Sequence, residues 1–367
     1  MKKLTFIALA SVSGFSFVPM AQAAVTCTLN PERPAINTIV ALQGGSITVG
    51  EDIPNGTAIF RQYFKVGNRP EFNCSSTTIP WVYQDTLRYA INPKPLSAWN
   101  SGNWAGKVYQ TGVSGIGIVA WYAGNSLPYS KPLNTTSNAG INIGALPEFD
   151  ISLIKIGTIT PGTIRGVDLP TIIDEFMFDR TNFIRASTVS FSGALNIVSQ
   201  TCTTPNPMVQ LGKYDISSVF KGLYSVTGWA DASIILTNCP RFYGTMDSGQ
   251  TNYGSDSPTD RGQAGTPQNN ELGVILRPNT AILDAAKGII GLRAEPNVAT
   301  GVGIQLATAI SGANVTAAEF NIEKRYTMRN SSDTTYKIPL NARYIQTNAK
   351  VTPGPANATL TYTINYY

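Results

Sequence analysis

The sequence contains no histidine, and only 13% of its residues are charged. Without histidine the chain cannot build Ser-His-Asp or Cys-His catalytic groups, His-Glu-x-x-His zinc sites or a histidine pH switch. Carboxylate chemistry, as in glycosidases, is chiefly what remains for an enzyme. We expect neither a metal nor a cofactor, because the four cysteines also include no Cys-x-x-Cys pair.

Clusters of basic residues are also missing. Lys and Arg number 27 against 22 Asp and Glu, and they are spread along the chain. A protein that binds nucleic acid usually carries a basic patch or stripe on one face. The sequence therefore predicts no nucleic-acid partner.

Long apolar runs are absent except at the N-terminus. Residues 4–18 are largely apolar, Lys2 and Lys3 precede them, and Ala21-Gln22-Ala23 supplies a small-x-small cleavage pattern. This arrangement predicts a secretory signal peptide over residues 1–23 and a mature chain from Ala24. The run is shorter than the about 18 to 20 residues that a spanning helix needs, which disfavours a membrane anchor.

The four cysteines predict disulfides, because the chain is expected to be exported. Three pairings are formally possible. Pairing neighbours, Cys27 with Cys74 and Cys202 with Cys239, is the one that gives each half of the chain its own bridge. We therefore favour these two disulfides.

Helical periodicity is scarce, whereas short strand-like runs bounded by Gly, Pro, Asn and Asp recur throughout. Repeated short strands with turn signals between them are typical of β-sandwiches. The sequence thus predicts an all-β fold. The clearest of these runs are residues 38–49, 56–66, 115–122, 149–159, 234–237 and 301–307.

The chain is long for one domain, since a domain usually has about 100 to 200 residues, and two domains are expected. We place the boundary between residues 186 and 187, because VSFSGALNIVSQTC reads as the opening strand of a new domain. The predicted domains are residues 24–186 and 187–367. The polar, turn-rich segment 244–270 is expected to be a long exposed connection.

Candidate binding residues gather in the first half, which holds four of the five tryptophans. The stretch LSAWNSGNWAGK places two tryptophans and two asparagines in one loop, and aromatic faces with flanking amides are typical of sugar pockets. Ring packing within the loop is an equally good interpretation. The candidates are Trp99, Asn100, Asn103 and Trp104 in this loop, with Trp81, Asp85 and Tyr129 elsewhere in the same half.

Two of the aromatic side chains in this half have a competing structural interpretation. Trp81 alternates with its neighbours as in a strand, so core packing is its favoured role. Trp121 and Tyr122 follow the strand-like run GIGIVA, and we expect Trp121 to face the core. The acids Asp168, Asp174 and Glu175 are further polar groups between the predicted strands.

The last stretch, VTPGPANATLTYTINYY, alternates apolar and polar residues with the period of a strand that has one apolar face. No further strand follows it to cover its edge, and unpaired edges invite pairing with other chains. From Cys202 onward the sequence resembles a chaperone-usher pilin domain. The resemblance rests on the order of CTTPNPMVQLG, IILTNCP, NVATGVGIQL, YKIPLNARY and PGPANATLTYTINYY.

The resemblance implies an immunoglobulin-like sandwich that lacks its final strand. In the family a periplasmic pilus chaperone, and then an adjacent pilin subunit recruited at the outer-membrane usher, donates that strand. The strand that receives it is expected to carry a glycine about fourteen residues before the end, alternating apolar residues and a penultimate tyrosine. Gly354, Leu360, Tyr362, Ile364 and Tyr366 match these positions.

A domain of about 160 residues with its own cysteine pair, placed before a pilin domain, resembles the layout of two-domain fimbrial tip adhesins. This implies an immunoglobulin-like, lectin-type N-terminal domain, and a protein exported through the periplasm to the fimbrial tip on the cell surface. The leading hypothesis is attachment of a bacterium to a host or surface glycan. Binding to an extracellular-matrix protein is the alternative, while an enzyme or a structural adaptor is less favoured.

Overall fold

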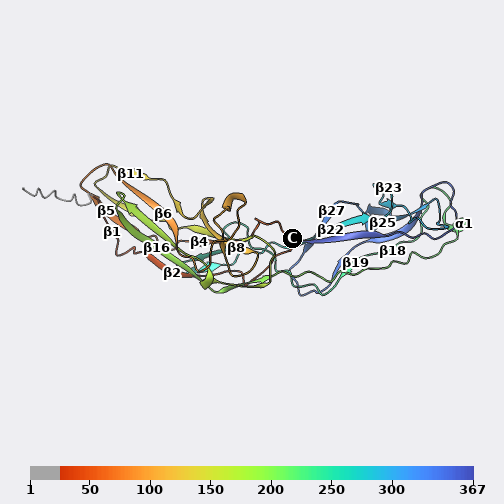
Figure 1. The fold of residues 1–367 in the computed structure, drawn as a ribbon, viewed down its shortest axis with the longest axis horizontal. Coiled ribbons are helices and arrows are strands. Elements are labelled where there is room, and N and C mark those ends of the chain that lie inside the picture. Colours follow the sequence, from red (N-terminus) through yellow and green to blue (C-terminus); the bar gives the residue numbers. More distant parts are fainter. Residues whose placement is uncertain (1–24) are drawn as a thin grey trace, which may run out of the picture.

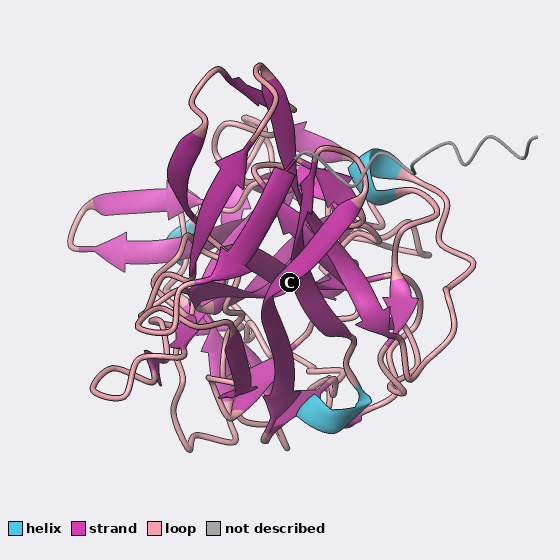
Figure 2. Ribbon diagram, turned by 90° about the vertical axis from the view of Figure 1, so that its left-hand side faces the viewer, coloured by secondary structure: helices cyan, strands magenta, loops and turns pink. Residues whose placement is uncertain are grey.

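The computed structural model describes residues 25–367, so the predicted signal peptide lies outside the described residues. Two β domains follow one another along the long axis of the molecule, and the C-terminus lies at the junction between them (Figure 1). Strands dominate the described chain (Figure 2), and its one α-helix is the short α1 (Ile216–Val219). No helix among these residues is long and apolar enough to cross a membrane. The predicted all-β fold is confirmed.

Two large sheets form the body of the N-terminal domain. The first has the order β10-β6-β15-β16-β2, with β11 also paired to β6. Its strands are β2 (Ile36–Ala41), β6 (Trp81–Ile91), β10 (Tyr129–Ser130), β11 (Asn134–Thr136), β15 (Thr171–Phe178) and β16 (Asn182–Ser192). The second has the order β21-β20-β4-β13-β8-β7, with β9 on β8. Its strands are β4 (Ala58–Lys65), β7 (Tyr109–Gln110), β8 (Ile116–Tyr122), β9 (Asn125–Ser126), β13 (Phe149–Lys155), β20 (Tyr253–Ser255) and β21 (Gly262–Gln263).

Two smaller sheets complete this domain. One consists of β1 (Val25–Leu29), β5 (Glu71–Ser76) and β12 (Gly140–Gly144), and the other of β14 (Gly162–Arg165), β17 (Ala194–Val198) and β3 (Ser46–Thr48). Cys27 and Cys74 are directly opposite in the β1–β5 register and form the first disulfide, as predicted. The short 3-10 turns η1 (Gly102–Trp104) and η2 (Gly166–Asp168) lie in loops.

The C-terminal domain has three sheets around a second apolar core. The largest contains β18 (Ala230–Asp231), β23 (Ile282–Asp284), β24 (Ile289–Ile290), β25 (Val302–Ser311), β26 (Asn314–Ala317) and β29 (Asn341–Gln346). A second pairs β19 (Ile234–Leu236) with β28 (Tyr336–Ile338). The third has the order β27-β22-β30, from β27 (Glu323–Met328), β22 (Asn270–Pro278) and β30 (Leu360–Tyr366). The second predicted disulfide, Cys202–Cys239, lies in this domain.

The domain boundary lies later than the expected position between residues 186 and 187. That position falls inside β16, which is one continuous strand paired with β15 and β2. The next strand, β17, also belongs to the N-terminal domain, where it pairs with β14 and β3. Alternation identifies a strand without indicating the sheet that it joins. The N-terminal domain thus extends to Val198.

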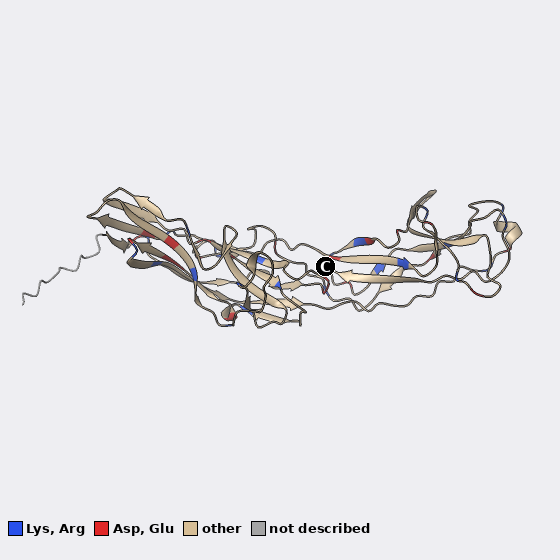
Figure 3. Cartoon of the chain, turned by 45° about the horizontal axis from the view of Figure 1, so that its top comes forward, with Lys and Arg blue, Asp and Glu red and all other residues tan. Residues whose placement is uncertain are grey.

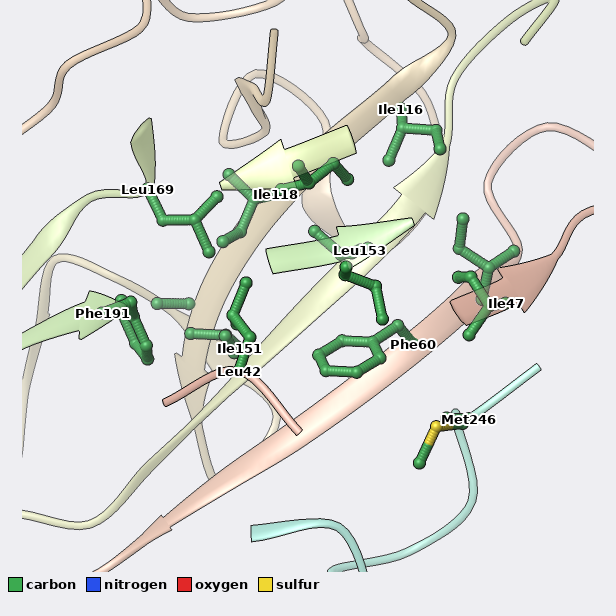
Figure 4. Packing of buried hydrophobic residues seen from close by; sticks show 14 of the residues in the cluster. Leu42, Ile47, Phe60, Ile116, Ile118, Ile151, Leu153, Leu169, Phe191 and Met246 are labelled. Atoms are coloured by element: carbon green, nitrogen blue, oxygen red, sulfur yellow. The ribbon is translucent and has the colours of Figure 1, made fainter. Parts of the chain in front are cut away.

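The segment 244–270 is not the exposed connection that its polar composition suggested. Its β20 pairs in parallel with β4 and its β21 extends the same sheet, so a segment from the C-terminal half completes the N-terminal domain. Met246, only 3% exposed, packs in the N-terminal core beside Phe60 and Ile47 (Figure 4). Hydrogen bonds between backbone groups attach this segment to the sheet of β4. Because such bonds do not require apolar side chains, the polar composition of the segment did not reveal them.

Candidate functional site

An open groove of about 1150 Å³ runs along the C-terminal domain. One wall is the segment 206–214, and the other is formed by residues 351–359 and the start of β30. Its floor is apolar, since it consists of core side chains from several strands. These are Ile234, Ile290, Ile304, Leu306, Leu340 and Ala342.

β30 is an edge strand beside this groove. It pairs with β22 on one side, and among the described residues no strand pairs with its other side. Except at Tyr366, whose N–H and C=O groups are hydrogen-bonded to Asp52, the edge N–H and C=O groups of β30 remain available, and such an edge is a template for an added strand. The walls touch near one end, where the hydroxyl of Tyr362 donates to the carbonyl oxygen of Pro205.

The alternating row of β30 turns toward the C-terminal core, as the sequence predicted. Tyr366 is 6% exposed, and its hydroxyl accepts a hydrogen bond of 3.0 Å from the amide of Cys202. Leu360, Tyr362 and Ile364 pack against the same core but stay half-buried. Apolar side chains that are left half-covered gain free energy when a partner covers them.

Gly354 lines the groove where the chain approaches a neighbouring segment closely. A Cβ atom at this position would lie 2.1 Å from the carbonyl oxygen of Asn297. Only glycine fits there without a shift of the backbone. This residue was selected from the sequence by resemblance, and the close approach gives a physical reason for it.

The aromatic loop of the N-terminal domain covers the outer face of β8 and β13. Trp99 and Trp104 are half-buried, and they pack with Trp121 over the fully buried Val119 and Ile154. Asn100 and Asn103 are exposed. The loop therefore brings the four predicted side chains onto one side of the domain, where the ring faces also serve packing.

Trp121 does not face the main core, contrary to expectation. Ile116, Ile118 and Ala120 point into that core, so the alternation of β8 places Tyr122 on the core side and Trp121 on the opposite side. There the guanidinium of Arg61 lies 4.7 Å from the centre of the Trp121 ring. Both faces of β8 are covered, so alternation alone did not identify the inner one.

The other candidates lie away from the aromatic loop. Trp81 is 1% exposed in a core cluster, and its indole N–H donates to the carbonyl oxygen of Asn138 at 2.8 Å. Asp85 is buried and forms an ion pair with Lys131. Tyr129 is half-buried, with its ring stacked on Tyr122 at 6.3 Å.

Two further residues of the N-terminal domain emerge from the structure. The sequence analysis missed Lys131, and it did not predict where Asp174 lies. Lys131 directly follows Tyr129 and Ser130, and its ammonium lies 4.6 Å from the centre of the Tyr122 ring. Asp174, noted only as an available acid, is fully buried beside Asp85. The signal was the interruption of an apolar strand row by an acid, on two strands of the same domain.

Charged residues are sparse along both domains (Figure 3). Among the described residues, no group of His, Cys, Asp or Glu has the geometry of a metal site. The groove of the C-terminal domain is apolar, and the aromatic loop offers rings and amides. These features support recognition of a strand and of an uncharged ligand.

Comparison with known proteins connects the C-terminal domain to a family. Residues 189–367 match the model of the fimbrial protein family. The resemblance of the C-terminal half to fimbrial proteins is thereby confirmed. A comparison with curated proteins found no match.

Matches among solved structures include three from fimbrial systems. The CupB6 tip adhesin of Pseudomonas aeruginosa is 12% identical, with 94% of this chain and 95% of that one covered and a TM-score of 0.35. The receptor binding domain of the adhesin MrkD1P of Klebsiella pneumoniae is 20% identical over 48% of this chain and 99% of its own, with a TM-score of 0.31. The CsuC-CsuE chaperone-tip adhesion subunit complex of Acinetobacter baumannii is 11% identical, with 93% and 100% covered and a TM-score of 0.23.

Proposed function

We propose that this chain is a fimbrial tip adhesin, whose N-terminal domain binds a receptor and whose C-terminal domain attaches it to the pilus. The observation that carries the proposal is the free edge of β30 beside an apolar groove of about 1150 Å³. A donated strand with alternating apolar residues would pair with that edge and place its side chains on the groove floor. The function is thus recognition and assembly, and not catalysis.

Three assembly partners follow from this role. A periplasmic pilus chaperone occupies the groove first, because an open apolar groove would otherwise promote aggregation. At the outer-membrane usher, the strand of an adjacent pilin subunit then replaces that of the chaperone. The protein is exported through the periplasm, and the finished tip stands on the cell surface, where many fimbriae together strengthen weak attachment.

Co-expression with a fimbrial chaperone tests the groove. Leu360→Asp places a charge on the apolar face of β30 and is expected to abolish capture of the chain by the chaperone. Thr361→Asp is the matched control, since Thr361 is exposed on the opposite face of the same strand. Normal capture of the Leu360→Asp chain would contradict the proposed strand donation.

For the receptor we propose a host or surface glycan bound at the aromatic loop. The half-exposed rings of Trp99 and Trp104 provide apolar faces, and the exposed Asn100 and Asn103 provide amides beside them. A sugar ring stacks on such a face while its hydroxyl groups form hydrogen bonds with the amides. An extracellular-matrix protein bound by a flatter surface is the alternative.

An array of glycans and matrix proteins separates these receptors, with the full chain held in its chaperone complex. Asn100→Ala and Asn103→Ala are the sharpest variants, because both side chains are exposed and neither supports the core. Trp104→Ala removes a ring but also uncovers Val119 and Ile154, so its folding must be verified. Binding of one glycan class that the asparagine variants lose supports the sugar site. Capture by a matrix protein alone would contradict it and leave the tip position intact.

A further inference from the structure

The inward row of β6 is interrupted by a carboxylic acid. Trp81 and Tyr83 pack in one apolar cluster of the N-terminal domain, and Leu87 and Tyr89 pack in another. Asp85 lies between these two pairs and is only 6% exposed. A buried acid at this position has a large desolvation cost unless it is paired or chemically altered.

A second carboxylic acid, Asp174, interrupts the inward apolar row of the adjacent strand β15. Ile172 belongs to one apolar cluster and Phe176 to the other, and Asp174 between them is 0% exposed. In the β6–β15 register Asp85 is opposite Phe176, and Asp174 is opposite Leu87. The two acids therefore occupy diagonal positions on one face of the sheet.

Lys131 brings an amine to this pair from the edge of the same sheet. Its backbone amide donates to the carbonyl oxygen of Asp85 at 2.8 Å, which continues the β10–β6 ladder by one residue. Its Nζ lies 2.5 Å from Oδ2 of Asp85 and 3.2 Å from the carbonyl oxygen of Leu146. The side chain of Lys131 is 16% exposed and lies against the ring of Tyr122.

Asp174 has no conventional partner. Among the described residues, no donor reaches either of its side-chain oxygens or Oδ1 of Asp85. Burial, followed by the nearby carboxylate of Asp85, raises the pKa of Asp174 well above its usual range. Burial therefore favours the neutral form of Asp174, which lies diagonal to Asp85 of the Asp85–Lys131 ion pair on the same face of the sheet. Its neighbour Glu175 pairs instead with Arg88 at 2.9 Å.

We propose that Lys131 and Asp85 become joined by an intramolecular amide bond, with Asp174 as the acid that transfers protons during its formation. An amine held against a carboxyl group, beside a protonated acid and away from water, has the proximity and the proton donor that this condensation needs. The product is neutral. It replaces a buried ion pair, whose desolvation is costly, and it releases water to the solvent.

The step balances without any other reactant. The ammonium of Lys131 passes one proton to the Asp85 carboxylate, and the neutral Nζ attacks Cγ of Asp85. Asp174 protonates the oxygen that gains charge, takes a proton from the nitrogen and delivers it to the departing hydroxyl. The Cγ–O bond breaks and one water leaves. Loss of the remaining hydroxyl proton restores Asp174 to its acid form.

The bond would tie the edge strand β10 to β6. β10 is only two residues long, and such a short edge strand separates easily from its sheet. With the amide in place, β10 cannot separate from β6 without breaking a covalent bond. We therefore expect a higher resistance of the N-terminal domain to heat and to protease, independent of which receptor it binds.

Mass spectrometry of the full chain, reduced and denatured, tests the proposal. The wild-type protein is expected to be lighter by one water than its mature sequence. Trypsin does not cut before Pro70 or Pro132, so the linked residues are expected in fragments 66–88 and 108–155, joined after reduction. A wild-type mass equal to that of the sequence, or two separate fragments, would overturn the inference.

Two variants test the roles proposed for Lys131 and Asp174 in forming the amide. Lys131→Arg keeps the charge but cannot form the amide, so its mass should equal that of its sequence, and its two fragments should separate. Asp174→Asn keeps the shape of the side chain without the acid and should also stay unlinked. A joined fragment pair in Asp174→Asn would exclude the proton-transfer role of Asp174. If either variant folds poorly, the wild-type mass alone still decides whether the bond exists.

Discussion

The backbone amide of Tyr366 donates a hydrogen bond of 2.8 Å to the carboxylate of Asp52 in the other domain. Asp52 returns the contact, since its own amide donates to the carbonyl oxygen of Tyr366 at 3.1 Å. Asn270 lies beside this pair and donates to the carbonyl oxygens of Thr48 and Tyr367. The strand that borders the groove is therefore also the strand that joins the two domains.

Gly50→Ala is expected to open this junction. A Cβ atom at Gly50 would lie 2.0 Å from the carbonyl oxygen of Tyr366, which is far inside van der Waals contact. We predict faster amide hydrogen exchange at Tyr366 and Asp52, with the core strands of both domains unchanged. Gly144→Ala is the control, because a Cβ atom there meets nothing within 4 Å. Unchanged exchange at the junction in Gly50→Ala would contradict the close contact.

Lys155→Met tests how the loop at the junction is held. The Lys155 side chain is buried, and its ammonium donates to the carbonyl oxygens of Glu51 and Ile53, the latter at 2.7 Å. Methionine would leave these acceptors without a donor, at a cost of about 1–3 kcal/mol in the free energy of unfolding. Denaturation followed by tryptophan fluorescence measures this loss. Lys65→Met, at an exposed ion pair with Asp260, should change stability by less than about 1 kcal/mol.

Met246→Ala tests whether the segment 244–270 stabilises the N-terminal domain. Met246 is 3% exposed in that domain's core, so truncation should cost about 2–5 kcal/mol. Four of the five tryptophans lie in the N-terminal half, so fluorescence mainly reports unfolding there. Met208→Ala is the matched control, since Met208 is 86% exposed. Equal stability of the two variants would show that the segment is not part of the N-terminal core.

This architecture also changes how the N-terminal domain should be isolated. A fragment that ends near residue 184 would cut β16, and one that ends at Val198 would still lack β20 and β21. Either fragment would leave the edge of β4 uncovered and a space where Met246 packs. Receptor binding is therefore best measured on the full chain.

The sequence predicted local structure well. Alternation identified β8 and β30, and the position of the cysteines in the two halves identified both disulfides. The strands follow from the pattern of neighbouring residues, and the disulfides follow from the presence of two cysteines in each half of the chain. The role of Gly354 came from resemblance, and its close approach to Asn297 became visible only in three dimensions.

What the sequence could not predict was how distant segments meet. β20 reaches β4 through backbone pairing, which leaves no apolar signature in its polar segment. Asp85, Asp174 and Lys131 are far apart in sequence, and only the strand register brings them together. Trp121 was assigned to the wrong face because a loop buries the outer side of β8 as well.

Amide hydrogen exchange of β30 tests the central claim most directly. The full chain would be measured alone and in complex with a fimbrial chaperone. If a donated strand pairs with the free edge, the outward amides of Tyr362 and Ile364 should become strongly protected in the complex. Little change is expected in the amides already bonded to β22 and in that of Tyr366, which is bonded to Asp52. A stable complex in which these outward amides still exchange as fast as in the free chain would contradict strand donation at this groove.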